Sequence, residues 1–401
     1  MMEKRDGMEQ GQAIVRVMHC YPGYMGGGAV ANAITALAEA EHRAGLQVGI
    51  AAFAHNRERT LSLAGQDHSP VGVYRTGRWL RAGSLRIPVV GRHGREVMRG
   101  FGPDVIHLHG VFNIEHLVAP LANCPVIWSP HGGLQEGVLR GNRSVVKQMF
   151  VGTLKRTLGD RLRCVHALTP SEERDISRRL PGLPITVIPL GATLKAHLND
   201  AALPPPVPGA RSLVFVFVGR LDIETKGLDL LIRAFAEIAG PHLAQETVRP
   251  RLVLVGPDQN GARRRLDRLT QRLGVTDSIE FTGPLTADEV RATLDRSDWY
   301  VQLSRHEGFG TATAEALLAG LPAVLSSNSG FVSYPEVSAL PHVVVVEPTE
   351  LGAIVGLKKA ARLGRTLRSL GVASASGIKA WLDWDRLAKQ YISMYRAAIA
   401  E

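Results

Sequence analysis

The sequence predicts an α/β protein with two doubly wound domains, each a parallel sheet covered by helices. Short β-branched runs alternate with longer helical patterns in both halves of the chain, which is the pattern of such sheets. The length of 401 residues accommodates two or three domains of ordinary size. Between the halves, residues 203–209 are rich in proline, which fits neither a helix nor a sheet ladder and favours a stiff linker. We therefore predict a hinge near residue 205.

The candidate strands are short aliphatic runs. In the first half they cover residues 13–18, 47–54, 104–108, 126–128 and 185–189. In the second half they cover residues 213–218, 252–255, 279–281, 299–303, 323–326 and 343–346. With the hinge, these strands set the predicted domains at residues 1–200 and 201–380, followed by a helical segment at 381–401.

Two helix starts are recognisable from capping residues. Thr169 offers a side-chain cap, Pro170 stands at the first helical position, and Glu172 stands at the third. Near the C-terminus we expect Asp385 to cap an amphipathic helix over residues 386–400. Its apolar face carries Leu387, Tyr391, Met394 and Tyr395. This helix is interpreted as a packing element.

Composition favours a cytosolic globular protein. Apolar residues make up 45% of the chain and charged residues 21%. The charged N-terminus is followed by no apolar signal sequence, and no run is long enough to cross a bilayer. Cys20, Cys124 and Cys164 are far apart in the sequence, so we expect reduced and mostly buried thiols.

The net charge of +10 is concentrated in the first half. Residues 1–200 carry 24 Lys and Arg against 16 Asp and Glu, a net of +8, which leaves +2 for residues 201–401. Seven arginines oppose one acid, Glu96, and they are Arg75, Arg78, Arg81, Arg86, Arg92, Arg95 and Arg99. Such a surface suits an anionic membrane or a phosphate-bearing acceptor, and equally an ordinary solvated face. No nucleic-acid-binding module is present.

The stretch Glu307-Gly308-Phe309-Gly310-Thr311-Ala312-Thr313-Ala314-Glu315 is the most informative in the chain. It follows a strand-like run and leads into an apolar helical run. A strand, a Gly-containing turn and a helix start together present unpaired N–H groups and a positive dipole end. A carboxylate at each end can then bind hydroxyls on either side of a phosphate. Sugar nucleotides have this layout of sugar hydroxyls, diphosphate and ribose hydroxyls.

Two other loops carry features of phosphate sites. Arg220 follows the strand candidate at 213–218, at the end where open α/β sheets bind ligands, and Lys226 closes the same loop. These cations can meet over one diphosphate, the arginine as a fork and the lysine as a point charge. The Gly-rich turn Gly26-Gly27-Gly28 also stands between a strand and a helix. Alone it is weak evidence, and a tight turn without ligand is the alternative.

The Arg-Lys loop combined with Glu-x7-Glu resembles the retaining glycosyltransferases of family 4, which have the GT-B fold. The resemblance extends over Gly26-Gly27-Gly28, residues 103–110, Pro130-His131-Gly132-Gly133, residues 219–227 and the C-terminal helix. It implies two Rossmann-like domains facing across a cleft, the N-terminal one for the acceptor and the C-terminal one for a nucleotide-sugar donor. The C-terminal helix would pack back on the N-terminal domain.

The resemblance also implies roles for individual residues. Arg220 and Lys226 would hold the diphosphate and stabilise its departing charge, with Gly219 at the start of the same motif. Glu307 would contact the donor sugar, beside His131, and Glu315 would take the ribose hydroxyls. The N–H groups of Gly308, Phe309 and Gly310 would reach the sugar, those near Thr311 and Ala312 the phosphate, and Gly27 and Gly28 would touch the diphosphate. Pro284 and Leu285 belong to the loop that is expected to contact the nucleotide base.

No cofactor or metal ion is expected to be required. Asp383-Trp384-Asp385 spells the D-x-D metal motif of the other glycosyltransferase fold, but its place at a helix start favours capping. His107 and His109 end a strand and are interpreted as core or loop histidines in preference to site residues. His306 is left out of the site, because it would point to the opposite side from Glu307.

The predicted function is transfer of a sugar from a nucleotide-diphosphate donor, UDP- or GDP-linked, in polysaccharide or glycolipid biosynthesis. The acceptor would be lipid-linked or a saccharide, with the protein cytoplasmic or peripheral at the inner membrane face. One alternative is transfer to a small soluble acceptor such as a sugar phosphate. Another is a non-catalytic nucleotide-sugar-binding protein of the same shape. Donor base, sugar, acceptor and linkage cannot be read from the residues.

Overall fold

The structure is a computed structural model of the chain, and its described part covers most of the sequence. The described residues are 14–21, 23–24, 28–54, 71–82, 85–89, 92–111, 122–136, 138, 144–192, 212–239 and 249–401. The predicted hinge near residue 205 and Gly26 and Gly27 lie outside them.

The first sheet has the order β4-β3-β2-β1-β5-β6-β7-β8. Its strands are β1 (Arg16–Cys20), β2 (Gln47–Ala54), β3 (Gly72–Ala82), β4 (Leu85–Val89), β5 (Val105–His109), β6 (Val126–Ser129), β7 (Leu162–Ala167) and β8 (Ile185–Val187). β1 pairs in parallel with both β2 and β5, so the strand order reverses there as in doubly wound folds. β3 and β4 form an antiparallel hairpin at the edge. The helices are α1 (Ala29–Arg43), α2 (Arg92–Phe101), α4 (Ser144–Leu158) and α5 (Pro170–Arg179).

The second sheet has the order β11-β10-β9-β12-β13-β14, and all its pairings are parallel. Its strands are β9 (Ser212–Val218), β10 (Arg249–Val255), β11 (Ile279–Gly283), β12 (Trp299–Gln302), β13 (Ala323–Ser326) and β14 (Val343–Val346). The helices that follow them are α6 (Ile223–Lys226), α7 (Leu228–Ala239), α8 (Ala262–Leu273), α9 (Ala287–Asp295), α10 (Thr311–Leu318), α11 (Pro335–Ser338), α12 (Glu350–Leu363) and α13 (Arg368–Trp381). β9, the first strand of this sheet in the sequence, lies in the middle of the sheet. The strand order reverses between β9 and its neighbour β12.

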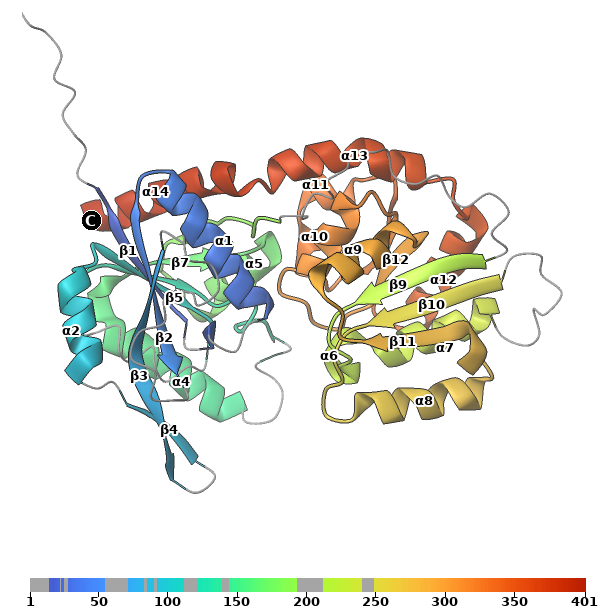
Figure 1. Cartoon of the computed structure of the whole chain (residues 1–401), viewed down its shortest axis with the longest axis horizontal. Helices are drawn as coiled ribbons and strands as arrows, with labels where there is room; N and C mark the ends of the chain where they lie inside the picture. Colours follow the sequence, from blue (N-terminus) through green and yellow to red (C-terminus); the bar gives the residue numbers. More distant parts are fainter. Residues whose placement is uncertain are drawn as a thin grey trace, which may run out of the picture. The chain divides into compact units, whose positions relative to one another are not determined.

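Helices cover both faces of the second sheet. In Figure 1, α7 and α8 lie on one side of β9 and β10, and α9 and α10 lie on the other. The core on the α7 side combines alternate strand residues with the apolar stripes of α7, α8 and α12, including Phe215, Phe217, Phe235, Leu266 and Leu357. This rigid layer fixes the carboxyl ends of β9 and β12, where the predicted donor residues follow.

The predicted fold class and most predicted strands are confirmed, with three additions. β3, β4 and β7 were not anticipated. β3 carries Arg75, Arg78 and Arg81 in a run without hydrophobic alternation, so its sequence indicates a charged surface. The basic segment is thus an edge hairpin followed by α2, on which Arg92, Arg95 and Arg99 are exposed.

Both helix starts can be compared with the structure. The cap at Thr169 is confirmed, since its side chain accepts the N–H of Glu172 and Pro170 occupies the first turn. The expected cap at Asp385 is wrong. The last helix, α14, spans Trp384–Ala400, and Asp383 accepts the N–H of Arg386. The helix thus begins two residues earlier in the sequence than the capping pattern indicated, and the D-x-D motif supplies its cap.

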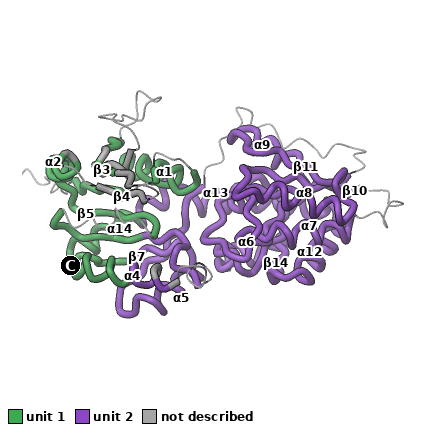
Figure 2. Tube along the Cα trace, turned by 90° about the horizontal axis from the view of Figure 1, so that it is seen from below, with its two compact units in different colours: residues 1–128, 152–164, 391–401 green, residues 129–151, 165–390 purple. Residues whose placement is uncertain are grey.

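The chain separates into two compact units by its internal contacts (Figure 2). Unit 1 contains residues 1–128, 152–164 and 391–401, and unit 2 contains residues 129–151 and 165–390. Inside unit 1, the hydroxyl of Tyr395 on α14 is 2.9 Å from His107 Nδ1 on β5 and donates to Glu41 on α1 at 2.7 Å. The domain limits 1–200, 201–380 and 381–401 remain a prediction.

Two further expectations concern the thiols and membrane spans. Cys124 and Cys164 are buried, Cys20 is half-buried, and all three are free. Burial raises the pKa of Cys20 to about 12 and that of Cys124 to about 11, so both are thiols at neutral pH. Among the described residues, no helix is both long enough and apolar enough to cross a bilayer.

Candidate functional site

The site lies in unit 2, where the second sheet reverses its strand order. The loop after β9 carries Lys226, and the loop after the adjacent β12 carries Glu307. Open α/β sheets bind ligands at this reversal, outside the carboxyl ends of the strands. Lys226 Nζ and Glu307 Oε2 form an ion pair, each with a side chain 14% exposed. The sequence pattern thus predicted a real juxtaposition of residues 81 positions apart.

A hydrogen-bond network fixes the Glu307 carboxylate. Oε2 accepts from Gln302 Nε2 at 3.1 Å and from the Ser304 hydroxyl at 3.4 Å. The amide of Gln302 is held in turn, because its Oε1 accepts from Thr313 on α10 at 2.9 Å and from Ser329 at 3.3 Å. A carboxylate with three donors on one oxygen has a set direction, which is what recognition of sugar hydroxyls needs.

The Lys226 loop is equally constrained. Asp222 caps α6 by accepting the N–H of Thr225, and Gly227 ends the helix at φ 64°. A Cβ on Gly227 would lie 2.2 Å from the carbonyl oxygen of Leu303, so glycine lets the two loops meet. The guanidinium of Arg305 completes the contact by a bidentate pair with Asp229 at 2.8 Å for each bond.

Arg220 does not join the Lys226–Glu307 pair in this structure. Its side chain is exposed and donates to Gln259 Oε1 at 2.7 Å. The backbone beneath it is fixed, since Gly219 donates its N–H to Val255 at 2.9 Å. Pro284 and Leu285 stand between β11 and α9, with Pro284 exposed and Leu285 half-buried.

The glycine loop between the two glutamates caps α10. Gly310, at φ 94°, is the N-cap, and its carbonyl accepts the N–H groups of Thr313 and Ala314. The N–H groups of Thr311 and Ala312 precede these first helical bonds and are placed for an anion. α10 begins three residues before the predicted run at 314, so Glu315 lies inside the helix. It is half-buried, and burial raises the pKa of its carboxyl group.

The loop Pro130-His131-Gly132-Gly133 lies against the Glu307 loop within unit 2. A Cβ on Gly132 would lie 2.9 Å from the Cα of Gly308, so the two backbones are in contact. Gln135 Nε2 also donates to the carbonyl of Glu307 at 3.3 Å. His131, whose φ is 52°, therefore stands beside the residues predicted to bind the sugar. Burial, and to a smaller extent His166, lower the pKa of His131 to about 3, so the ring is neutral at neutral pH.

Glu172 holds this loop and was not predicted to do so. Its buried carboxylate accepts the N–H of Gly132 at 2.6 Å and that of Leu168 at 2.8 Å. Burial raises its pKa to about 7, and the two N–H donors oppose that shift. Arg179 adds a second bond from α5 to the carbonyl of Leu134 at 2.9 Å. In the sequence, Glu172 was interpreted only as the third residue of a helix.

Gly28 lies in unit 1, where it caps α1 at φ 96°, and Gly27 lies outside the described residues. The approach of this turn to a diphosphate therefore remains a prediction. The structure brings together Lys226, Glu307, Gly308, Gly310 and His131, and it places Arg220 apart from them. Gln302 and Ser304 were missed, although both flank Glu307 at the end of a strand, which is the signal that identified Arg220.

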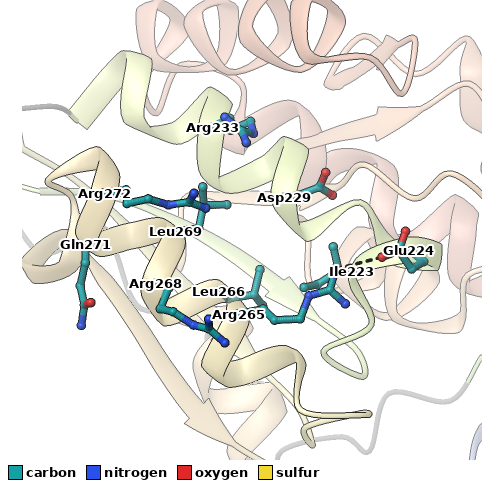
Figure 3. A pocket seen from close by; sticks show the side chains of 10 residues that line it. All are labelled: Ile223, Glu224, Asp229, Arg233, Arg265, Leu266, Arg268, Leu269, Gln271 and Arg272. Carbon is teal, nitrogen blue, oxygen red and sulfur yellow. Dashed lines mark hydrogen bonds and ion pairs between the residues drawn. The ribbon is translucent and has the colours of Figure 1, made fainter.

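A separate pocket of about 490 Å³ opens between α6, α7 and α8 (Figure 3). Arginines dominate its wall: Arg233, Arg265, Arg268 and Arg272 face Glu224 and Asp229. None of the predicted donor residues lines it. The predicted donor residues therefore lie apart from this pocket, at the strand reversal.

Comparison with known proteins agrees with this architecture. The model of the group 1 glycosyl transferases matches residues 206–348, and that of Glycosyltransferase Family 4 matches residues 26–195. The chain belongs to the family 4, or group 1, glycosyltransferases, which have the GT-B fold.

Two relatives and two solved structures illustrate what this chain is similar to. A GDP-mannose:cellobiosyl-diphosphopolyprenol alpha-mannosyltransferase of Xanthomonas oryzae is 25% identical over 74% of each chain. A D-inositol 3-phosphate glycosyltransferase of Salinispora arenicola is 31% identical over 47% of this chain and 42% of its own length. Among solved structures, the sucrose-phosphate synthase of Thermosynechococcus elongatus has a TM-score of 0.72 at 21% identity, covering 96% of this chain and 99% of that chain. Anabaena HepE, solved with UDP and glucose, has a TM-score of 0.70 at 17% identity, covering 96% of this chain and all of its own.

Proposed function

We propose that the chain is a retaining, metal-independent glycosyltransferase that moves a sugar from a nucleotide-diphosphate donor to a lipid-linked saccharide. This proposal rests mainly on the Lys226–Glu307 ion pair at the strand reversal, where Glu307 lies in the loop that leads to the N-terminus of α10. In this structure each charge neutralises the other. We infer that donor binding redirects them, Lys226 to the diphosphate and Glu307 to the sugar hydroxyls.

The chemistry requires stabilisation of a departing diphosphate. Cleavage of the glycosyl–phosphate bond builds negative charge on the leaving group, which Lys226, Arg220 and the N–H groups of Thr311 and Ala312 would receive. Arg220 has to leave Gln259 for this role, and its exposed side chain is able to move. A preorganised cation at such a position typically contributes on the order of 10²–10³ in rate.

Retention follows in this proposal from reaction on one face of the sugar. The leaving phosphate oxygen takes the acceptor proton, so no side chain is assigned as a base. His131, neutral because of its lowered pKa, would serve as a hydrogen-bond partner of the sugar. Glu315, one turn into α10, would bind the ribose hydroxyls.

The donor proposed first is a GDP-linked sugar, because the mannosyltransferase relatives that span three quarters of this chain name GDP-mannose. UDP-linked sugars are the second choice. The same relatives name a diphosphopolyprenol acceptor, which supports a lipid-linked acceptor in our proposal.

A surface of the protein supports work at a membrane. Val145 and Met149 on α4 are each 67% exposed and stand one turn apart, so they share a face. Lys155 and Arg156 follow in its last turn, and α4 has no acid in its first turn. Exposed apolar side chains next to cations are the elements of attachment to an anionic bilayer.

The competing proposal is transfer to a small soluble acceptor, as the name of the inositol-phosphate relatives implies for those proteins. A non-catalytic donor-binding protein is the third possibility. The test combines thermal shift with GDP-, UDP-, ADP- and TDP-sugars and product analysis with polyprenyl-diphosphate saccharide or with sugar phosphate. Stabilisation by a donor without product from either acceptor would favour the non-catalytic protein.

The membrane part has its own test. Sedimentation with anionic vesicles that disappears at high salt is expected, and Val145→Ser with Met149→Ser should weaken it. Leu351→Ser, a change at an exposed leucine on α12 in unit 2, is the matched control. Equal recovery in the supernatant with and without vesicles would reject the attachment.

A further inference from the structure

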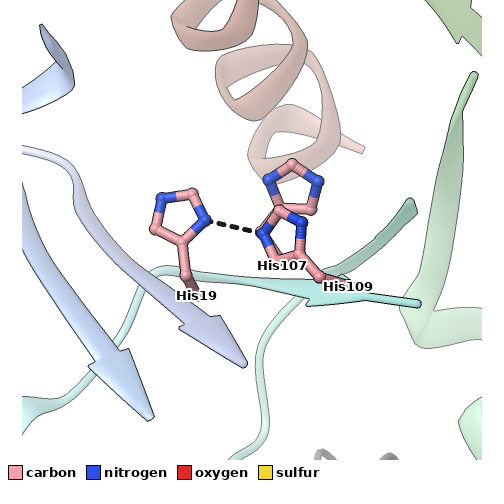
Figure 4. Close-up of side chains that lie close together, drawn as sticks. All are labelled: His19, His107 and His109. Atoms are coloured by element: carbon pink, nitrogen blue, oxygen red, sulfur yellow. Dashed lines mark hydrogen bonds between the residues drawn. The ribbon is translucent and has the colours of Figure 1, made fainter. Parts of the chain in front are cut away.

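Three histidines meet in the core of unit 1. His19 lies on β1 and pairs in register with His107 on β5, and His109 follows on the same strand. Their exposed fractions are 0%, 0% and 2%, respectively. One ring nitrogen of each lies within 4.8 Å of the other two, and Figure 4 shows the three rings beside one another above these strands. Burying three polar rings is unfavourable unless their nitrogens are bound.

Oxygen atoms orient the outer nitrogens of two of these rings. His19 Nε2 is 2.8 Å from Glu41 Oε2, and His107 Nδ1 is 2.9 Å from the hydroxyl of Tyr395. That hydroxyl donates to the other oxygen of Glu41 at 2.7 Å. Histidines that bind metal ions characteristically give their outer N–H to a carboxylate or another oxygen, which fixes the tautomer and the ring.

The inner nitrogens of the cluster are close to one another as a result. When His19 donates from Nε2 to Glu41, its Nδ1 carries a lone pair and faces His109 Nε2 at 2.9 Å. Two imidazole nitrogens at this separation share either one proton or one metal ion. The Glu41 carboxylate is fully buried, and a dication at the inner nitrogens would balance its charge.

We propose that His19 Nδ1, His109 Nε2 and His107 Nε2 bind one Zn²⁺ ion, with Glu41 and Tyr395 holding the ligands from behind. Three imidazoles and one further position match tetrahedral zinc, whose Zn–N bonds of about 2.0–2.1 Å place ligand nitrogens about 3.3 Å apart. His19 Nδ1 and His109 Nε2 are 2.9 Å apart and one nitrogen of each ring lies within 4.8 Å of the other two, so small side-chain shifts would complete the geometry.

The ion has a structural role. It links β1 and β5 directly, and through Glu41 and Tyr395 it connects them to α1 and to the last turns of α14. The residues assigned to the donor all lie outside this cluster, so the proposal does not depend on the proposed function. Brief exposure to chelator would leave such a buried ion in place.

The test uses the full-length protein without an affinity tag. Elemental analysis is expected to give about one Zn²⁺ per chain, and growth with cobalt should give the visible absorption of tetrahedral Co²⁺. His109→Ala should lose both signals, and Glu41→Gln should keep the ion with roughly 10–100-fold weaker affinity. His342→Gln removes a fully buried histidine in unit 2 and should change neither.

Two outcomes overturn the proposal. The first is wild-type protein with no zinc and no cobalt absorption after exposure to either ion, which would leave the cluster as a proton-sharing network. The second is zinc retained equally by His109→Ala, which would place the ion elsewhere. If His109→Ala fails to fold, Glu41→Gln and titration of stripped wild-type protein with Co²⁺ decide the matter.

Discussion

The carboxylate of Glu172 accepts the N–H of Gly132 at 2.6 Å, and Gly132 in turn contacts the backbone of Gly308. A buried acid on α5 thereby positions the loop of His131 without reaching the proposed substrate. Both residues belong to unit 2, although their loop and helix come from the first half of the sequence.

Glu172→Ala is expected to lower kcat/KM by about 10–100-fold, because the His131 loop loses its anchor and small misplacements near a reacting centre are costly. Two buried N–H groups lose their acceptor, which destabilises the fold by about 1–3 kcal/mol for each group. Steady-state kinetics and urea unfolding measure the two effects. Activity equal to wild type in folded Glu172→Ala would show that the His131 loop keeps its position without Glu172.

Glu172 also gives a pH dependence of stability. Its folded pKa is about 7, above the ordinary 4.5, so its contribution is complete below pH 4.5 and is lost as the pH rises to about 7. Glu172→Gln cannot ionise, and its free energy of unfolding should lack this decline. Unfolding of both proteins between pH 4 and 8 tests this, since the lowered pKa values of His131 and His166 affect both equally. Parallel curves would contradict the burial assigned to Glu172.

Lys226→Ala and Glu307→Ala should each reduce transfer by on the order of 10²–10³ while the fold persists. Lys358→Ala, which removes an exposed lysine paired with Glu237, is the control and should retain activity. Product formation with the donor found by thermal shift is the measurement. Near-normal transfer by purified Lys226→Ala would remove the diphosphate role of this lysine.

Gly227→Ala should destabilise unit 2 by more than about 1 kcal/mol, because a left-handed residue gains a Cβ that meets the carbonyl of Leu303. Gly377→Ala is the matched control. It lies in α13 with open space around the new Cβ, so stabilisation of up to about 1 kcal/mol is expected. Thermal or urea unfolding compares them, and equal stability of the two variants would mean that the loop adapts freely.

Transfer should proceed unchanged after brief treatment with EDTA, because side chains and N–H groups supply all the charge stabilisation in the proposed mechanism. Activity assays with and without added Mn²⁺ or Mg²⁺ check this. Strict dependence on either ion would place the enzyme in a different mechanistic class. The buried histidine cluster is tested separately, by metal content.

The sequence predicted the fold class because strands and helices alternate with clear periodicity. It also placed Lys226 and Glu307 after neighbouring strands, while their roles toward a donor stay a prediction. Glu307 and Lys226 meet as the pattern implied. Among the features that escaped prediction, three have clear physical reasons. The strand β7 interrupts its hydrophobic run with arginine and histidine. Glu172 looks like an ordinary capping-box residue until its acceptor role across 40 positions is seen. His19, at the end of β1, gave no local sign that it would face His107 and His109.

The exposed position of Arg220 marks the limit of prediction at the site itself. The end of a strand defines the backbone position of the residue that follows it, but it does not define where the side chain of that residue points. The sequence placed it correctly on the loop after β9, and the bond to Gln259 points it elsewhere in the absence of donor.

The contact between His107 and Tyr395, which are 288 positions apart in the sequence, has a consequence for folding during synthesis. Residues 391–401 contribute Tyr391 and Tyr395 to the core of unit 1, and both are almost fully buried. Unit 1 therefore cannot complete its core before residues 391–401 have been synthesised.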